Sequence, residues 1–278
     1  MSPQHAREVA AGERFAFGEN WRRFLQGLSD AQIQEAERSL AQMLDTPSLE
    51  GTRFLDVGCG SGLSSLAARR MGADVESFDY DPASVACALE LKHRFFPSDE
   101  RWTIREGSAL DPGFLTSLGK FDIVYSWGVL HHTGAMWSAL ESLRHLVAPG
   151  GRLYIAIYHD AGRSSRIWLR VKRLYNRLPS RLRPLVLGPA LGVLWGPILL
   201  RDLRDGRPLR TWQGYGGTRG MKPWRDVVDW VGGYPYEFAK PEAICDFYRS
   251  HGFTLLKLRT VEGNGCNEFT FLRSKGAP

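Results

Sequence analysis

The sequence predicts an α/β protein built around a mostly parallel β-sheet. Three observations support this fold class. Short apolar segments alternate with stretches of helical periodicity between residues 51 and 160, and two further strand-like segments close the chain. The composition, with 43% hydrophobic and 24% charged residues, is that of a globular protein. Because neighbouring parallel strands need a crossover connection, this alternation predicts right-handed βαβ units.

Residues 1–50 are expected to form a helical cover that precedes the sheet. Apolar side chains recur at helical spacing over 21–28 and again over 33–43, and Ser29-Asp30 separates the two stretches. We therefore expect helical structure over residues 13–47, interrupted at Ser29-Asp30.

The sheet is expected to occupy residues 51–160, followed by an insertion and a return to the core. The predicted strands are Arg53–Val57, Asp74–Phe78, Trp102–Glu106, Phe121–Ser126 and Arg152–Tyr158, with helices near 62–71, 82–95 and 134–147. Residues 161–240 are rich in Arg, Trp, Pro and Gly and do not resemble strands. Residues 241–278 then predict a final helix and a strand hairpin whose turn contains Gly263-Asn264-Gly265.

The net charge of +6 is unevenly distributed, with −5 in residues 1–159 and +11 in residues 160–278. No apolar signal segment opens the chain. The longest uncharged run, Pro184–Leu200, is 17 residues long and contains three prolines and three glycines. A membrane span needs ~20 apolar residues in a continuous helix, so we expect no span and a cytoplasmic protein.

The strongest functional signal is the segment Phe54–Gly62, where a predicted strand meets a predicted helix. Gly58, Cys59, Gly60 and Gly62 form a G-x-G-x-G turn that lets a ligand approach the backbone closely. This spacing alone is also compatible with a dinucleotide. Asp56 favours S-adenosylmethionine instead, because a carboxylate could meet an amino acid group but would repel a pyrophosphate. The third glycine also comes one residue early for the dinucleotide fingerprint.

Three later turns should complete a cofactor site, because the carboxyl ends of parallel strands meet at one edge of the sheet. Asp79 ends the second strand, where a carboxylate can accept both ribose hydroxyls, and Tyr80 follows it. Ser108 and Ala109, after the third strand, should lie beside the adenine. Trp127, at the end of the fourth strand, should line the reactive end of the cofactor.

Taken in order, these segments resemble class I S-adenosylmethionine-dependent methyltransferases. The resemblance rests on FLDVGCGSG, SFDYDP, EGSAL, FDIVYSWGVLHH and APGGRLYIAIY, and covers roughly residues 50–160. It looks closest to the small-molecule branch that includes the ubiquinone-biosynthesis O-methyltransferases. It implies a Rossmann-like, doubly wound sheet of seven strands with the last strand antiparallel. It also implies that a preceding segment covers the cofactor, and Phe17 and Trp21 occupy that place here.

Methyl transfer to a hydroxyl also needs a base, and His131 and His132 are the candidates. Side chains of adjacent residues diverge, so we expect one of the two to face the pocket. The turn that contains Tyr234 and Glu237 could bring these side chains near the methyl group. We expect no metal site. Ser126-Trp127-Gly128-Val129 lacks the Asn/Asp-Pro-Pro-Tyr motif of enzymes that methylate exocyclic amines, which favours another acceptor.

The insertion at 161–240 is expected to act as a lid over the substrate. Its first part interleaves basic and apolar residues and predicts an amphipathic helix; the basic residues are Arg163, Arg166, Arg170, Lys172, Arg173, Arg177, Arg181 and Arg183. Together with the uncharged stretch that follows, segment 163–200 could rest on the inner face of a membrane. It could also bind RNA phosphates.

The leading hypothesis from the sequence is methyl transfer to a hydroxyl, or another nucleophile, of a small or lipid-like molecule. An RNA methyltransferase, with tRNA as one substrate, is a second hypothesis, although we expect nucleic acid less than a small molecule. A third is non-methylating chemistry on the same cofactor, either aminocarboxypropyl transfer or cyclisation. The sequence does not name the acceptor atom, because the same fold serves many reactions.

Overall fold

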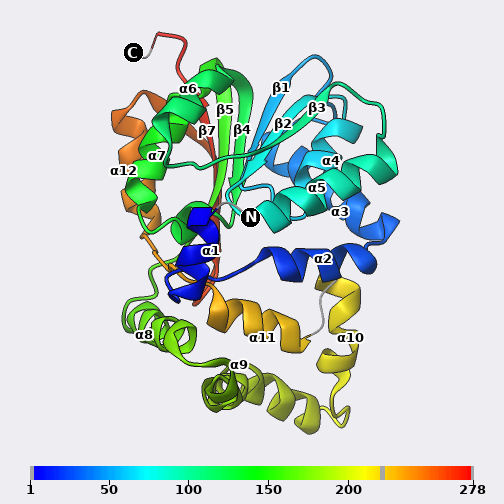
Figure 1. The fold of residues 1–278 in the computed structure, drawn as a ribbon, viewed down its shortest axis with the longest axis vertical. Helices are drawn as coiled ribbons and strands as arrows, with labels where there is room; N and C mark the ends of the chain where they lie inside the picture. Colours follow the sequence, from blue (N-terminus) through cyan, green and yellow to red (C-terminus); the bar gives the residue numbers. More distant parts are fainter. Residues whose placement is uncertain (1–2, 220–222, 277–278) are drawn as a thin grey trace.

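The computed structural model describes residues 3–219 and 223–276, and its centre is one seven-stranded sheet (Figure 1). The strands are β1 (Arg53–Val57), β2 (Asp74–Asp79), β3 (Trp102–Glu106), β4 (Phe121–Trp127), β5 (Val147–Tyr158), β6 (Phe253–Arg259) and β7 (Cys266–Arg273). Their order is β3-β2-β1-β4-β5-β7-β6, and β7 runs antiparallel to both neighbours. The predicted fold class is therefore confirmed.

Helices cover both faces of this sheet, as a doubly wound fold requires. On one face, α3 (Asp30–Leu44), α4 (Leu63–Arg70) and α5 (Pro82–Phe95) enclose a core that includes Phe54 and Trp102. On the other face, α6 (Pro112–Leu118), α7 (Met136–Arg144) and α12 (Pro241–Ser250) pack on Val124, Ile155 and Phe271. Strands buried on both faces explain why the sequence shows continuous apolar runs instead of alternation.

The predicted break at Ser29 separates α2 (Gly18–Gln26) from α3, and it is a capping box. The Ser29 backbone N–H and hydroxyl both donate to the Gln32 side chain, at 2.8 and 2.9 Å. An additional short helix, α1 (Pro3–Ala10), precedes α2 and was not expected from the sequence. It has eight residues, too few for a convincing periodic pattern.

The described residues of the insertion form four α-helices, which gather at one end of the sheet (Figure 1). They are α8 (Arg163–Arg177), α9 (Pro184–Arg204), α10 (Arg210–Arg219) and α11 (Pro223–Gly232). Their shared core includes Trp168, Tyr175 and Trp195. Lys172, which the sequence groups with the basic face of α8, is instead buried, with its ammonium group 4.1 Å from the centre of the Trp230 ring. We call helices α8–α11 the lid.

The segment Pro184–Leu200 lies within a single helix in spite of its three prolines and three glycines. Helix α9 is continuous over 21 residues, although Pro189 and Pro197 lie inside it. A proline leaves the carbonyl four residues earlier without its helical partner. Those carbonyls belong to Leu185 and Val193, both of which are strongly exposed, so water can solvate them.

Candidate active site

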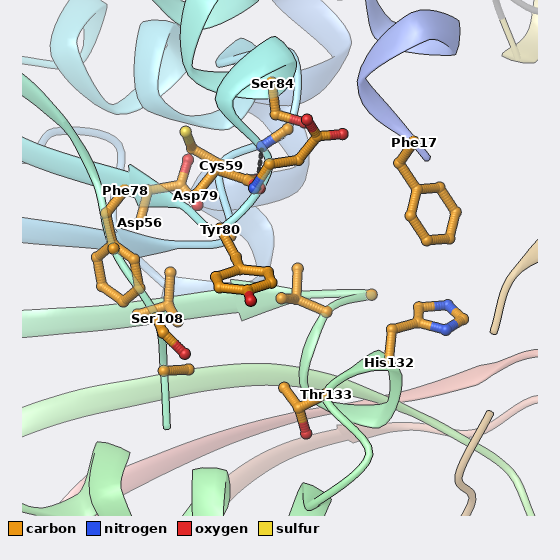
Figure 2. Close-up of a pocket in the computed structure, with 18 of the residues that line it drawn as sticks. Phe17, Asp56, Cys59, Phe78, Asp79, Tyr80, Ser84, Ser108, His132 and Thr133 are labelled. Carbon is orange, nitrogen blue, oxygen red and sulfur yellow. Dashed lines mark hydrogen bonds between the residues drawn. The ribbon is translucent and has the colours of Figure 1, made fainter. Parts of the chain in front are cut away.

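A cavity of about 950 Å³ lies at the carboxyl ends of β1, β2, β3 and β4, within the ~300–1,000 Å³ range of small-molecule sites. Figure 2 shows side chains from these strand ends and from the N-terminal cover converging on it. The predicted residues that line it are Phe17, Trp21, Asp56, Gly58, Cys59, Gly60, Asp79, Tyr80, Ser108, Ala109, Trp127 and His132. Segments far apart in the sequence thus meet at one site.

The turn after β1 needs glycine at two cavity-lining positions. Gly58 has φ +75°, and a Cβ there would lie 2.3 Å from the Val129 side chain. Gly60 has φ +54°, and its Cβ would lie 3.0 Å from the Trp21 indole nitrogen. Gly62 differs from expectation, because it does not line the cavity; it begins α4 and packs against Ala88 of α5. Its role is helix packing, for which a φ of +81° also favours glycine.

Two carboxylates lie in the cavity wall, and the fold holds each of them in place. Asp56 accepts a hydrogen bond from the Ser65 hydroxyl at 2.5 Å. Asp79 accepts from the backbone N–H groups of Gly60 at 2.9 Å and Asp81 at 2.8 Å. A carboxylate offers about four lone pairs, so each retains acceptor capacity for a ligand.

Burial makes both carboxylates easier to protonate than a free aspartate. It raises the pKa of Asp56 to about 7, against the hydrogen bond from Ser65, and the Asp79 charge adds to the rise. Burial likewise raises the pKa of Asp79 to about 6, although the N–H groups of Asp81 and Gly60 favour its charged form. A cationic ligand would lower both pKa values by favouring the ionised acids.

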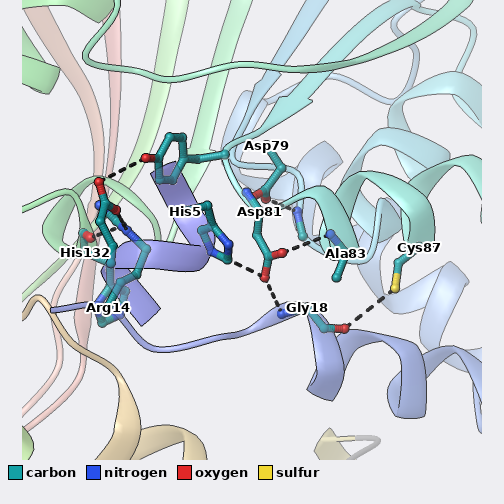
Figure 3. Close-up of polar contacts among 11 residues, drawn as sticks. His5, Arg14, Gly18, Asp79, Asp81, Ala83, Cys87 and His132 are labelled. Atoms are coloured by element: carbon teal, nitrogen blue, oxygen red, sulfur yellow. Dashed lines mark hydrogen bonds and ion pairs between the residues drawn. The ribbon is translucent and has the colours of Figure 1, made fainter. Parts of the chain in front are cut away.

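Asp81 has a structural role as the N-cap of α5. It begins α5 and accepts a hydrogen bond from the Ala83 N–H at 2.9 Å. It also accepts from the Gly18 N–H at 2.8 Å and lies 3.9 Å from the His5 imidazole (Figure 3). One carboxylate therefore connects α1, the start of α2 and the cavity wall.

The sequence analysis missed the contribution of α1 and the loop after it. Arg14 donates to Glu8 at 2.8 Å and to the backbone oxygen of His132 at 2.9 Å. The Tyr80 hydroxyl donates to Glu8 at 3.0 Å, and the Arg14 guanidinium lies 4.9 Å from the Tyr80 ring centre. Glu8, Arg14 and His5 all line the cavity. The charges of Glu8 and Arg14 were the only signal, and their partners in the core, Tyr80 and His132, are 66 to 118 residues distant in sequence.

The two adjacent histidines have different surroundings, as expected. His131 is fully buried outside the cavity, where its Nδ1 accepts a hydrogen bond from the Tyr158 N–H at 3.2 Å. His132 lines the cavity beside Phe17, at a ring-centre distance of 5.1 Å. Its Nδ1 lies 2.5 Å from the Pro235 carbonyl oxygen. A carbonyl can only accept, so Nδ1 carries the hydrogen and Nε2 holds a lone pair.

His132 is neutral at physiological pH, because its pKa lies far below the neutral range. Burial lowers the pKa of His132 to about 3, against the bond to Pro235, and the nearby charges of Lys172 and Arg14 lower it further. Among the described residues, the hydrogen bond from Nδ1 to Pro235 is the only one that the His132 ring makes. The ring therefore presents an uncharged acceptor.

The expectation for Tyr234 and Glu237 is corrected by the geometry, because neither side chain lines the cavity. The Glu237 carboxylate accepts from the Met136 N–H at 3.0 Å, at the start of α7. The first N–H groups of a helix lack intrahelical partners and attract a carboxylate. Tyr234 contributes its carbonyl oxygen, which accepts from the Phe15 N–H at 2.9 Å. Glu237 thus joins the segment after α11 to the start of α7, and Tyr234 joins it to the N-terminal segment.

Comparison with known proteins identifies the family. The model of a methyltransferase domain family matches residues 21–191, which is more than half of the chain. The chain belongs to this methyltransferase family. The match agrees with the S-adenosylmethionine-dependent methyltransferase that the sequence predicts.

Individual relatives match this methyltransferase over less than half of its length. A ubiquinone biosynthesis O-methyltransferase of Rhizobium rhizogenes is 36% identical over 110 residues, 39% of this chain and 42% of the relative. A tRNA U34 carboxymethyltransferase of Methylococcus capsulatus is 32% identical over 120 residues, 43% of this chain and 36% of the relative. The match spans less than half the length of these curated relatives.

Solved structures extend the fold similarity to nearly the whole methyltransferase. The magnesium protoporphyrin IX methyltransferase of Synechocystis with bound S-adenosylhomocysteine gives a TM-score of 0.55 at 16% identity. The similarity covers 92% of this chain and 94% of that chain. A Rickettsia typhi protein, PKMT2, in complex with S-adenosylhomocysteine also gives 0.55, at 13% identity and with coverage of 87% and 53%. At these identities the similarity concerns the fold.

The cavity of the methyltransferase fits S-adenosylmethionine chemically. Asp79 retains lone pairs for the two ribose hydroxyls, and Asp56 offers an acceptor for the amino group. The absence of a Cβ at Gly58 and Gly60 lets the side chains of Val129 and Trp21 pack directly against this turn. Phe17, Trp21 and Trp127 supply aromatic faces for a flat base or a sulfonium.

Proposed function

We propose that this methyltransferase transfers its methyl group to a hydroxyl of a small or lipid-like molecule. The observation that carries the proposal is the tautomer of His132. Its Nδ1–H bonds to Pro235, so Nε2 of this cavity-lining residue keeps a lone pair that can accept a proton. Two properties support it further: the cavity is partly lined by aromatic side chains, and matched relatives include ubiquinone biosynthesis O-methyltransferases.

The protein mainly has to align the reactants. When bound, S-adenosylmethionine supplies an activated methyl group on a positively charged sulfur. Asp79 would hold the ribose, the turn at Gly58–Gly60 would support the amino acid end, and Ser108 would face the adenine. Holding reactants in a productive geometry can supply several kcal/mol, on the order of 7–11, of the barrier reduction.

His132 would orient the acceptor hydroxyl and take up its proton at Nε2. Its Nδ1–H bond to Pro235 fixes the ring, so Nε2 remains the acceptor throughout. A neutral imidazole with a low pKa is a weak base before reaction. The proton becomes more acidic as the hydroxyl oxygen bonds to carbon, so a weak but fixed acceptor suffices.

The variant His132→Asn tests this role, because an asparagine amide can still donate towards Pro235 but has no counterpart of Nε2. We expect kcat to fall about 10²- to 10⁴-fold, while the Kd for S-adenosylhomocysteine changes less than threefold. His145→Asn, an exposed position at the far end of α7, is the matched control. Substrates would be catechols with and without an alkyl tail, with products analysed by mass spectrometry.

Unchanged kcat in His132→Asn would refute the proposed proton acceptor. Methylation of tRNA, without methylation of any of the catechols, would refute a small or lipid-like molecule as the methyl acceptor. Formation of methylthioadenosine in place of S-adenosylhomocysteine would show that the bound cofactor serves a different transfer.

A further inference from the structure

Helix α9 exposes an unusually apolar surface. Within the 25-residue region Ser180–Arg204, an 18-residue window has a mean hydropathy of 1.4, and only 17% of that window is buried. By length and composition it could cross a membrane, the single such helix in the described parts of the chain. Leu185 is 70% exposed and Val193 is 68% exposed. A soluble protein rarely leaves such side chains together in water without a partner.

The opposite side of α9 packs on the other lid helices, so only its exposed side could meet a lipid phase. Leu187, Ala190 and Trp195 are buried in the lid core. The Trp195 ring lies 4.7 Å from that of Trp212 and 5.1 Å from that of Tyr215. With one side packed, α9 is arranged to lie along an interface, where an amphipathic helix buries only its apolar face.

Positive charge flanks the same surface on α8. Arg163, Arg170 and Arg177 recur every seventh residue and are exposed. Arg163 precedes the exposed Ile167 by four residues, and Arg170 precedes the exposed Leu174 by the same interval, so they are neighbours on the helix. No acidic residue occurs between residues 161 and 201. Positive and apolar side chains thus alternate along one stripe.

An apolar groove separates the two helices. Its volume is about 470 Å³, and Ser164 is the only polar residue among those that line it. Ile167 and Val171 line the α8 side, and Leu185 and Val193 line the α9 side. The most exposed leucine and valine of α9 therefore lie at a groove wide enough to take part of a hydrocarbon chain.

We infer that the α8–α9 face docks this methyltransferase peripherally on an anionic lipid bilayer. The arginines would contact lipid headgroups, and the exposed side chains of α9 would enter the upper acyl region. RNA fits less well, because the aromatic residues that could stack on bases, Trp168 and Tyr175, are buried. A symmetric second copy fits less well too, because its arginines would approach this copy's arginines.

Vesicle co-sedimentation tests the docking on the full-length chain. We expect binding to vesicles of phosphatidylglycerol and phosphatidylcholine, a decrease with added salt, and little binding to phosphatidylcholine alone. The triple variant Arg163→Gln, Arg170→Gln, Arg177→Gln should weaken partitioning about 100-fold. The double variant Leu185→Ser, Val193→Ser should weaken it while keeping the salt dependence.

Matched controls remove the same side chains elsewhere on the surface. Arg38→Gln, Arg101→Gln and Arg249→Gln remove three exposed charges away from the lid. Leu89→Ser and Leu256→Ser remove two exposed apolar side chains on the core. Both controls should bind vesicles as the parent does. Titration with S-adenosylhomocysteine verifies that every variant is folded.

Three outcomes would overturn the docking. The first is equal sedimentation of the parent, triple and double variants. The second is tRNA binding that depends on the arginines, without vesicle binding. The third is a parent dimer that the double variant converts to a monomer. These experiments measure membrane binding and not methyl transfer. If the docking is refuted, the proposed methylation of a hydroxyl still stands. If the methylation is refuted, the docking can still be tested.

Discussion

Replacing Asp79 tests the cofactor site most directly. Asp79 ends β2, and its two oxygens accept from the backbone N–H groups of Gly60 and Asp81. The remaining lone pairs would accept the two ribose hydroxyls of S-adenosylmethionine. The variant Asp79→Ala removes both acceptors, whereas Asp79→Asn retains one oxygen and removes the charge.

The expected loss of affinity follows from the number of charged hydrogen bonds. Each hydrogen bond to a charged group contributes about 1.5–3 kcal/mol. The loss of two such bonds in Asp79→Ala therefore predicts a Kd for S-adenosylhomocysteine raised by at least ~100-fold. Asp79→Asn loses about one bond, so we expect a Kd raised ~10- to 100-fold.

Isothermal titration with S-adenosylhomocysteine measures these changes, and circular dichroism verifies the fold. Asp74→Asn is the matched control, because Asp74 is exposed at the opposite end of the same strand. We expect its Kd to equal that of the parent. A folded Asp79→Ala protein that binds within threefold of the parent would refute the assignment of Asp79 to the ribose.

Three further outcomes are expected. Gly58→Ala should abolish cofactor binding, because the new Cβ would lie 2.3 Å from the Val129 side chain at a φ of +75°; wild-type affinity would contradict this. Cofactor affinity should be constant above pH 8 and fall by tenfold or more towards pH 5, because Asp79 and Asp56, with pKa values of about 6 and 7, take up protons as the pH decreases; a titration series that is flat with pH would count against it. Glu237→Gln should lower Tm by a few degrees, from the loss of about 1 kcal/mol at the start of α7, without changing the Kd; weakened cofactor binding at an unchanged Tm would show that Glu237 acts in the site instead.

Local sequence patterns predicted much of the core. Strands β1 and β3 begin and end where the apolar runs predict, and helix α5 also matches its expected range. The break at Ser29 carries a capping box, which needs only residues three apart. The cavity-lining positions of Asp56 and Asp79 follow from the rule that ligands bind at the carboxyl ends of parallel strands.

Other features could not be read locally, because they depend on contacts between distant segments. Gly62 has the same residue type as Gly58 and Gly60, but its surroundings come from α5, so it packs a helix. Glu237 and Tyr234 were candidates for the cavity until the position of α7 and the N-terminal loop was known. Lys172 has the sequence spacing of a surface residue and is buried by Trp230.

The sequence by itself determined the fold class, the family and the ends of the strands that form the cofactor site, because periodicity and glycine spacing are local properties. Only the tertiary structure decided the state of His132. Its tautomer depends on Pro235, 103 residues away, and its low pKa depends first on burial and then on Lys172 and Arg14. Hydrogen-bond geometry and desolvation are set by the packed surroundings, which no sequence window contains.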